Sequence, residues 1–255
     1  MNALGRMGSQ VILPYRGDGT ELRDHKLMGD LGQIVPLPYQ IRDKRSVERV
    51  IQDSNVVINA ISRRRESRNF SMHDTHVNAT HMIARTAAEL GVDRFIQFSV
   101  SNAQADSPSR QYRTKWHGEE VAKAFYPEAT IIRPGQMCGN FDWFFERFAW
   151  QWALPFRRPT IVGPKQRLQP VNYLDVARAV AVCVMDPLST AGKTYELHGN
   201  VCATKEQFFA RMQEVLTGRR TAYKHYRAWN PWLLGAMLKP IYPVHKNVCS
   251  GIVGI

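Results

Sequence analysis

The chain has 255 residues, of which 44% are hydrophobic, and this is enough for one large α/β domain or for a domain with a smaller lobe. No apolar run approaches the length of a membrane-spanning helix. The formal net charge of +12 favours an acidic partner such as anionic lipid, nucleic acid or a polyanionic cofactor, but the sequence has no RNA-binding signature and no zinc-finger spacing. We therefore expect no nucleic-acid partner. The four cysteines are widely spread without a CxxC pair, so we also expect no metal site and no disulfide scaffold.

The first residues read as the end of a helix, followed by a strand over 10–13. Gly5 and Gly8 fit positions at the carboxyl end of such a helix. A doubly wound domain should begin with a strand, a glycine-rich turn and the start of that helix. These parts are missing from the sequence, and we therefore expect that its true N-terminus lies upstream.

Hydrophobic periodicity then predicts alternating helices and strands. We expect a helix over 22–28, a strand over 34–37, a helix over 45–52 capped by Asp43, a buried strand over 54–62, a long helix over 70–90 ended by Gly91, a strand over 95–100, a helix from Ser109, a strand over 129–133, a helix ending near Met185, a strand over 193–197 and a helix over 204–216 capped by Thr204. Strands alternating with helices predict an α/β fold with a doubly wound parallel sheet.

The chain is expected to divide into a core and a smaller C-terminal lobe. The core is a Rossmann-like unit over 1–136, to which 169–198 returns, and the lobe comprises 137–168 and 199–255. Aromatic residues crowd 140–154, where core packing is the default interpretation. The segment 226–243 is rich in Trp and Tyr, and it fits a membrane interface or protein groove as well as a helix packed on its own domain.

Arg16 comes directly after the first predicted strand. A guanidinium there suits a ribose 2′-phosphate, because its fork of N–H groups matches phosphate oxygens. A solvated loop arginine is the alternative in so basic a chain. For the run Arg63–Arg65 we favour the solvated loop over a phosphate contact.

A strand ending in Ser99, followed by a helix that carries Tyr112 and Lys115, resembles the active-site segment of the short-chain dehydrogenase/reductase family. In that family the tyrosine is the proton donor and the lysine lowers its pKa and holds the nicotinamide ribose. The family spacing places the tyrosine four residues before the lysine, which is Gln111 here. Tyr112 is one residue late, about 100° further around the helix. We therefore expect that the acid is lost and assign no catalytic residue; alternatively, Tyr112 is a displaced remnant, or Tyr112 and Lys115 are ordinary surface residues.

Five segments together resemble the atypical extended branch of this family and, more narrowly, its accessory subunits in mitochondrial respiratory complex I. They are 4–16, 28–33, 54–59, 94–96 and 169–171. The resemblance implies a peripheral protein on the matrix side of the inner membrane, near the quinone-reduction region and in contact with other subunits there. It also implies a structural NADPH that is held but not turned over.

Carried over by position, the resemblance implies a set of cofactor-binding residues: Arg16 at the 2′-phosphate, Gln40 and Ile41 at the adenine, Ala60, Ile61 and Ser62 at the end of a strand, and Ser99, Lys115, Pro134 and Met137 at the nicotinamide end. Gln40 replaces an aspartate that is usual in the family. Since the glycine-rich turn is absent, a chain that truly begins here should bind the dinucleotide weakly. The alternatives are an NADPH-dependent reductase or epimerase acting on a small molecule, and a basic module that binds membrane surfaces.

Overall fold

A seven-stranded sheet forms the centre of the larger of two units in the computed structural model, which describes residues 1–63, 65–140, 142, 145–146, 149, 165–218 and 252–254. The first unit comprises Met1–Pro134, Asp175–Leu197 and Asn247–Ile255, and the second comprises Gly135–Leu174 and His198–Lys246. The predicted aromatic helix over 140–154 and the segment 226–243 lie largely or wholly outside the described residues.

The elements follow one another as the hydrophobic pattern predicts, with a few local differences. The first unit contains α1 (Asn2–Arg6), β1 (Val11–Tyr15), the 3-10 helix η1 (Gly19–Leu22), α2 (Arg23–Lys26), β2 (Ile34–Pro38), α3 (Lys44–Ile51), β3 (Val56–Asn59), the π-helical turn η2 (Asp74–Asn78), α4 (Ala79–Glu89), β4 (Arg94–Phe98), α5 (Arg110–Phe125), β5 (Thr130–Pro134), most of α7 (Tyr173–Met185), α8 (Pro187–Thr190), β9 (Thr194–Leu197) and β11 (Ile252–Gly254). The second unit contains β6 (Met137–Cys138), β7 (Arg167–Leu168), β8 (Val171–Asn172), β10 (Ala203–Thr204) and α9 (Lys205–Thr217).

The sheet of the first unit has the strand order β2-β1-β11-β3-β4-β5-β9. The pairs β1–β2, β3–β4, β4–β5 and β5–β9 are parallel, which confirms the predicted doubly wound fold. The strand β11 is antiparallel to both β1 and β3. We predicted residues 199–255 in the smaller lobe, but the structure places Ile252–Gly254 in the large sheet. The physical reason is that the facing edges of β1 and β3 carry backbone N–H and C=O groups that need partners.

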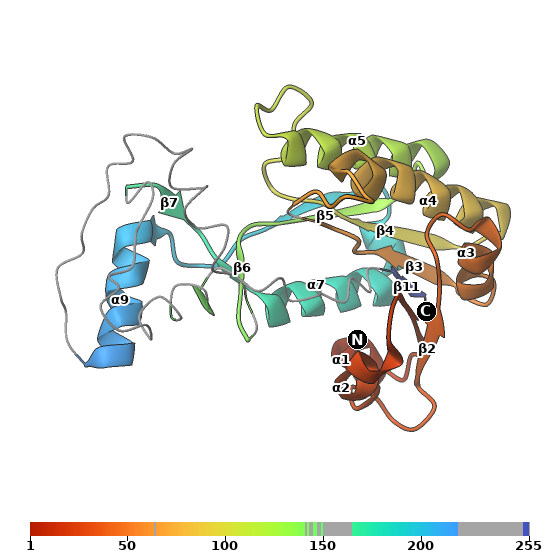
Figure 1. Cartoon of the computed structure of the whole chain (residues 1–255), viewed down its shortest axis with the longest axis horizontal. Coiled ribbons are helices and arrows are strands. Elements are labelled where there is room, and N and C mark those ends of the chain that lie inside the picture. The colour runs from red at the N-terminus through yellow and green to blue at the C-terminus, as the bar shows by residue number, and fades with distance from the viewer. Residues whose placement is uncertain are drawn as a thin grey trace. The chain divides into compact units, whose positions relative to one another are not determined.

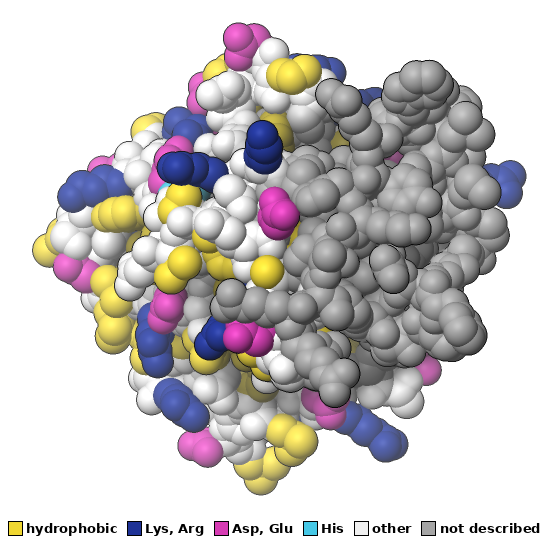
Figure 2. Space-filling model, turned by 90° about the vertical axis from the view of Figure 1, so that its left-hand side faces the viewer, with side chains coloured by type: hydrophobic (Ala, Val, Ile, Leu, Met, Phe, Trp, Pro, Cys, Tyr) yellow, Lys and Arg dark blue, Asp and Glu magenta, His cyan; other side chains and the backbone are white. Residues whose placement is uncertain are grey.

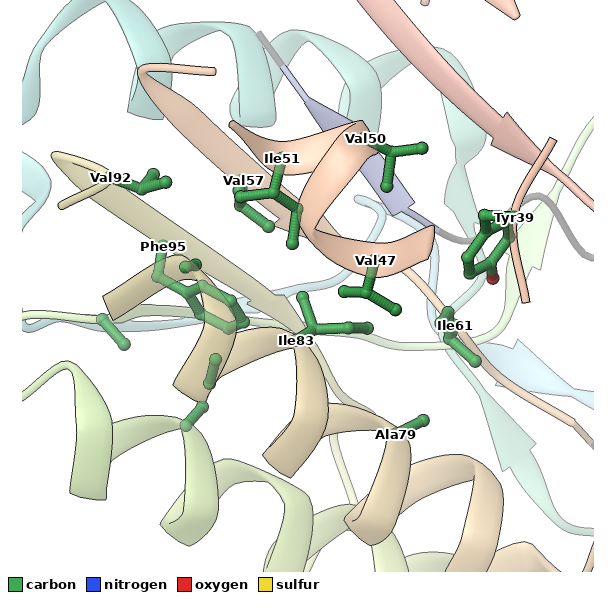
Figure 3. Packing of buried hydrophobic residues seen from close by; sticks show 14 of the residues in the cluster. Tyr39, Val47, Val50, Ile51, Val57, Ile61, Ala79, Ile83, Val92 and Phe95 are labelled. Carbon is green, nitrogen blue, oxygen red and sulfur yellow. The ribbon is translucent and has the colours of Figure 1, made fainter. Parts of the chain in front are cut away.

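Helices cover both faces of the sheet, with α3, α4 and α5 on one face and α1 and α7 on the other (Figure 1). Neighbouring strand residues point to opposite faces. In β3, Val57 joins the cluster under α3 and α4, and Ile58 joins the cluster under α7. Figure 3 shows the first cluster, in which Tyr39 and Ile61 lie close together at one end.

Local signals account for several of the helix ends. The Asp43 side chain accepts a hydrogen bond from the Arg45 N–H at 3.1 Å and caps α3 as predicted, and Thr204 caps α9 in the same way. Gly91 follows α4 with a φ of +72°, which glycine adopts without steric cost. Gly8 likewise follows α1 in the left-handed region, whereas Gly5 lies inside that helix, and the prediction of Gly5 as a cap is wrong.

The predicted long helix over 70–90 is interrupted. Its first part contains the π-helical turn η2, and the regular α4 begins only at Ala79. The turn lies against α5: a Cβ added to Gly118 would lie 2.4 Å from the backbone oxygen of His76. The missing side chain of Gly118 therefore lets the two backbones approach closely.

Replacing Gly118 by alanine is expected to lower the free energy of unfolding by about 1–3 kcal/mol, because the new methyl group forces the two backbones apart. The steric cost should exceed the stability of roughly 1 kcal/mol that replacing glycine by alanine normally adds inside a helix. Urea denaturation checks the prediction, with the exposed Glu120→Ala on the same helix as control. An unchanged or raised stability of Gly118→Ala would contradict the close approach.

Candidate functional site

The carboxyl ends of the parallel strands share one edge of the sheet, and most of the predicted site residues follow these ends. Arg16 follows β1, Gln40 and Ile41 follow β2, Ala60–Ser62 follow β3, Ser99 follows β4, and Pro134 ends β5. In open α/β sheets, ligands bind in the crevice beyond this edge.

Two adjoining depressions lie at this edge and share Arg16, Arg63 and Phe70. The smaller one is also lined by the apolar side chains of Tyr39, Ile41, Ile61 and Ala79. The larger one is an open hollow of about 440 Å³ lined by Arg16, Gln40, Arg42, Arg63, Ser67, Asn69 and Phe70. Apolar walls beside guanidinium groups suit a planar ring that carries an anionic group.

Two of the arginines of this hollow are held by hydrogen bonds to neutral partners. The Arg42 guanidinium donates to the Asn69 carbonyl oxygen at 2.6 Å, and Arg63 donates to Ser67 Oγ at 2.8 Å. Within the part of the chain that the structure describes, neither Arg16, Arg42 nor Arg63 forms an ion pair with a carboxylate. The hollow thus presents positive charge that an anion could pair with.

Lys115 is buried at the ends of two strands. Its Nζ donates to the Ile61 carbonyl oxygen at 3.1 Å and to the Phe98 carbonyl oxygen at 3.2 Å. Burial lowers the pKa of this ammonium to about 8, against the opposing effect of the Glu119 charge. An ammonium has three N–H groups, so one more is available to a ligand. Lys115 therefore joins β3 and β4 at the predicted nicotinamide end.

Ser99 lies at the same end of β4. Its side-chain oxygen is buried and has no hydrogen-bond partner among the described residues. Buried hydroxyl groups normally have such a partner, and an unpaired one can mark a ligand contact. Gln111 and Tyr112 are both half-buried on the first turn of α5. Met137 belongs to the second unit, where β6 pairs with β8, so the structure does not test its predicted place beside Lys115.

His76 supports the site through hydrogen bonds to the loop after β3 and to α5. Its Nε2 accepts a hydrogen bond from the Arg63 backbone N–H at 3.3 Å, and its Nδ1 lies 2.8 Å from Thr114 Oγ1. Burial, together with the positive charge of Lys115, lowers the pKa of His76 to about 3. A neutral imidazole thus connects the loop after β3 to α5.

Part of this arrangement agrees with the predicted site residues. Arg16, Ile41 and Ile61 meet in the smaller depression, and Gln40 lines the larger one, while Ala60 and Ser62 are exposed and line neither. Arg42 and Phe70 were not among the predicted site residues, and Arg63 was predicted to lie in a solvated loop. The only local signal for Phe70 is a single aromatic residue at the end of a charged loop.

Other classes of site find no support in the described residues. They contain no group of three side chains that could hold a metal ion. The helices that the structure describes are all too short or too polar to cross a membrane. Figure 2 shows one face of the molecule, on which described Lys and Arg side chains lie among acidic and hydrophobic ones rather than in one continuous patch.

The parallel strands with helices on both faces define a doubly wound, Rossmann-like fold. The chain belongs to the NmrA-like family, whose model matches residues 28–228. UDP-glucuronic acid 4-epimerase from Bacillus cereus, solved in complex with NAD, has the same fold with a TM-score of 0.68 at 18% identity, over 80% of this chain and 72% of that chain. A dTDP-4-dehydrorhamnose reductase from Clostridium acetobutylicum matches with a TM-score of 0.62 at 19% identity, over 84% and 83% of the two chains.

Curated relatives confirm the narrower resemblance. The chain is 43% identical over 202 residues to NADH dehydrogenase (ubiquinone) 1 alpha subcomplex subunit 9, mitochondrial, of Mus musculus. The matched region covers 78% of this chain and 52% of the relative. It is 34% identical over 241 residues to the mitochondrial NADH-ubiquinone oxidoreductase 40 kDa subunit of Neurospora crassa, covering 94% of this chain and 60% of the relative. The chain thus spans between about half and three fifths of the length of these relatives.

The described residues fit a dinucleotide at two of its three parts. The apolar walls with their arginines fit an adenosine that carries a phosphate, and Ser99 with Lys115 offers an unpaired hydroxyl and a spare N–H near the predicted nicotinamide end. The glycine-rich turn that usually holds the pyrophosphate is not in this sequence.

Proposed function

We propose that this chain is a non-catalytic accessory subunit of mitochondrial complex I that holds NADPH as a structural cofactor. The similarity to named complex I subunits supports the assembly. The arginines at the carboxyl ends of β1 to β3, which form no ion pair with a described carboxylate, support the cofactor. Its partners would be other subunits near the quinone-reduction region, and its place the matrix side of the inner membrane.

The observation that carries the proposal is the hollow with its arginines. Arg16 lies directly after β1, where a 2′-phosphate on the adenosine ribose would meet its guanidinium, and Ile41 and Ile61 offer apolar surface to the adenine. Lys115 would direct its remaining N–H at the nicotinamide ribose while it holds the ends of β3 and β4. NADPH supplies a hydride when it is used in catalysis; here we propose that the protein only holds it.

The absence of turnover rests on the position of Gln111. An amide cannot donate a proton to a carbonyl substrate as a phenol can, and Gln111 occupies the position four residues before Lys115. Cofactor loss should then reduce assembly of the complex and leave its specific turnover unchanged.

Replacing Arg16 by glutamine is expected to weaken NADPH binding about 10- to 100-fold, because one charge-assisted contact to phosphate is lost. Nucleotide released from the purified protein, or from its parent complex, would be identified by mass and fluorescence. The control is Arg85→Gln, which removes the same charge from the surface of α4.

The test separates the two parts of the proposal. Stoichiometric NADPH in the wild type and its loss in Arg16→Gln would support the cofactor. Co-migration with complex I in mild detergent would support the assembly. A stable free pool with none in the complex would contradict the assembly, whatever the nucleotide content.

A reductase or epimerase is the second candidate, and the unpaired buried hydroxyl of Ser99 favours it. In this case Tyr112 would have to move into the acid position, or Ser99 would have to act together with a water molecule. A screen of carbonyl substrates should then show turnover that disappears in Tyr112→Phe, whereas the accessory role predicts no turnover in either protein.

A further inference from the structure

We propose that Arg42, held against Phe70, makes this pocket select an adenosine that carries a phosphomonoester over one with a free ribose. The inference rests on the proposed function as a dinucleotide-binding protein and adds a specificity-determining residue to it.

Two guanidinium groups gather about one aromatic ring. The guanidinium carbon of Arg42 lies 4.3 Å from the centroid of the Phe70 ring, and that of Arg16 lies 5.1 Å from it. Both distances are within the range of cation–π attraction. Arg16 comes from the segment after β1, Arg42 from the segment after β2, and Phe70 from the loop after β3, so the fold brings three distant segments together.

The position of Arg42 is fixed from two sides. Besides the ring, the Asn69 carbonyl oxygen accepts one of its N–H groups at 2.6 Å. A guanidinium has five N–H groups in a rigid plane, so the others remain available. Because the side chain is already held, less conformational entropy is lost when it binds an anion.

Neither guanidinium beside Phe70 forms an ion pair with a described carboxylate. The carboxylate that feels the charge of Arg42 is Asp74, whose pKa is lowered mainly by hydrogen bonds from Ser71 and in smaller part by Arg42. Asp74 lines the neighbouring depression, but its carboxylate accepts hydrogen bonds from the Ser71 N–H, the Ser71 hydroxyl and the Asn78 amide. Two like charges beside one ring repel each other, and a dianion between them would remove this repulsion. The open hollow that Arg16 and Arg42 both line has room for a phosphate.

Selectivity follows from the number of cations. A phosphomonoester can accept hydrogen bonds from both guanidinium groups at once, whereas a ribose hydroxyl carries no charge to pair with either. A pocket that binds the free ribose normally has a carboxylate after the second strand of such a fold. In this chain β1 corresponds to that second strand, and Arg16 follows it in place of the carboxylate. Arg42 adds a second cation.

The test titrates NADPH and NADH separately into the full-length protein and compares their dissociation constants. Arg42→Gln should weaken NADPH about 10- to 100-fold and leave NADH within about threefold, so that the preference for NADPH collapses. Arg42→Lys keeps the charge without the fork and should give an intermediate preference. Phe70→Tyr should keep the preference, Phe70→Leu should reduce it severalfold, and Arg85→Gln should leave it unchanged.

The outcomes distinguish a failure of this inference from a failure of the proposed function on which it rests. If NADPH binds and Arg42→Gln weakens both nucleotides equally, or neither, the inference is overturned and the proposed function stands. If the wild type binds neither nucleotide, the cofactor part of the proposed function fails and the inference fails with it, while the assembly part is still tested by co-migration with complex I. Circular dichroism checks the fold of each variant, and Arg42→Lys with Phe70→Leu decides the question if Arg42→Gln does not fold.

Discussion

Replacing Arg133 by methionine is expected to lower the free energy of unfolding by about 3–5 kcal/mol. Arg133 of β5 holds Glu119 of α5 through two hydrogen bonds, Nε to Oε1 at 3.0 Å and a terminal N–H to Oε2 at 2.7 Å. The Glu119 side chain is 0% exposed. Without Arg133, a carboxylate would remain buried against the sheet with no guanidinium partner.

The size of the loss comes from desolvation rather than from the attraction of the pair. Taking a carboxylate out of water costs several kcal/mol, which the paired guanidinium largely offsets in the folded chain. Glu196 also lies 3.5 Å from the Arg133 guanidinium, but its side chain is exposed, so this second pair adds little to the stability. The Lys115 ammonium is one turn away on α5, but two backbone carbonyl groups already hold it.

A double variant tests this explanation. Glu119→Met with Arg133→Met should recover most of the lost stability, since replacing both partners of a buried pair by apolar residues is often neutral. The control is Arg178→Met, which breaks an exposed pair with Asp175 and should leave the unfolding free energy almost unchanged. Chemical denaturation measures all four proteins. A double variant no more stable than Arg133→Met alone would contradict the desolvation argument.

Features that depend on local chemistry were predictable from the sequence. The buried strand around Val57, the Asp43 cap of α3 and the Thr204 cap of α9 each follow from neighbouring residues. The π-helical turn did not follow, because the 3.6-residue period of 70–90 fits a continuous helix. The close approach of Gly118 to His76, which accompanies this turn, joins residues 42 positions apart in the chain. The pairing of β11 is likewise set by distant backbone groups.

The site residues likewise fall into those that local sequence predicts and those that depend on contacts between distant segments. Arg16 was predictable because its place after a strand has a chemical meaning by itself. Arg42 and Phe70 have no such local meaning, and their role emerges only when three loops meet. Lys115 was predicted to face the cofactor, but its contacts to the Ile61 and Phe98 carbonyl oxygens depend on how far β3 and β4 extend. Its predicted contact with the nicotinamide ribose stays a prediction.

Lowering the pH from 7.5 to 5 is expected to remove about 2 kcal/mol of stability through His76 alone. The pKa of His76 is about 3 in the folded chain and 6.5 for an ordinary histidine, so the unfolded chain binds the proton more readily. The contribution is therefore fully present above pH 6.5 and is lost as the pH falls from 6.5 towards 3. The variant His76→Gln has no such group, and its stability should depend less on pH.

The two stability curves should converge on acidification. At pH 7.5, His76→Gln should be less stable by about 1–3 kcal/mol, because buried hydrogen bonds to Arg63 and Thr114 are lost or weakened. Near pH 5, this difference should have shrunk markedly or vanished. Carboxylates that titrate in the same range affect both proteins and cancel in the comparison. The control is the exposed His117→Gln, whose curve should run parallel to that of the wild type.

The hydrogen bonds give a reason for this behaviour that does not depend on the value of the pKa. The Arg63 N–H donates to Nε2, so this nitrogen carries no proton, and Nδ1 donates to Thr114 Oγ1, whose own proton can go to the Arg110 carbonyl oxygen at 2.9 Å. A second proton on the ring would place an N–H against the Arg63 N–H and a positive charge close to Lys115. Protonation must therefore break the link between the loop after β3 and α5. If His76→Gln lost stability with pH as steeply as the wild type, another group would have to be the one that titrates.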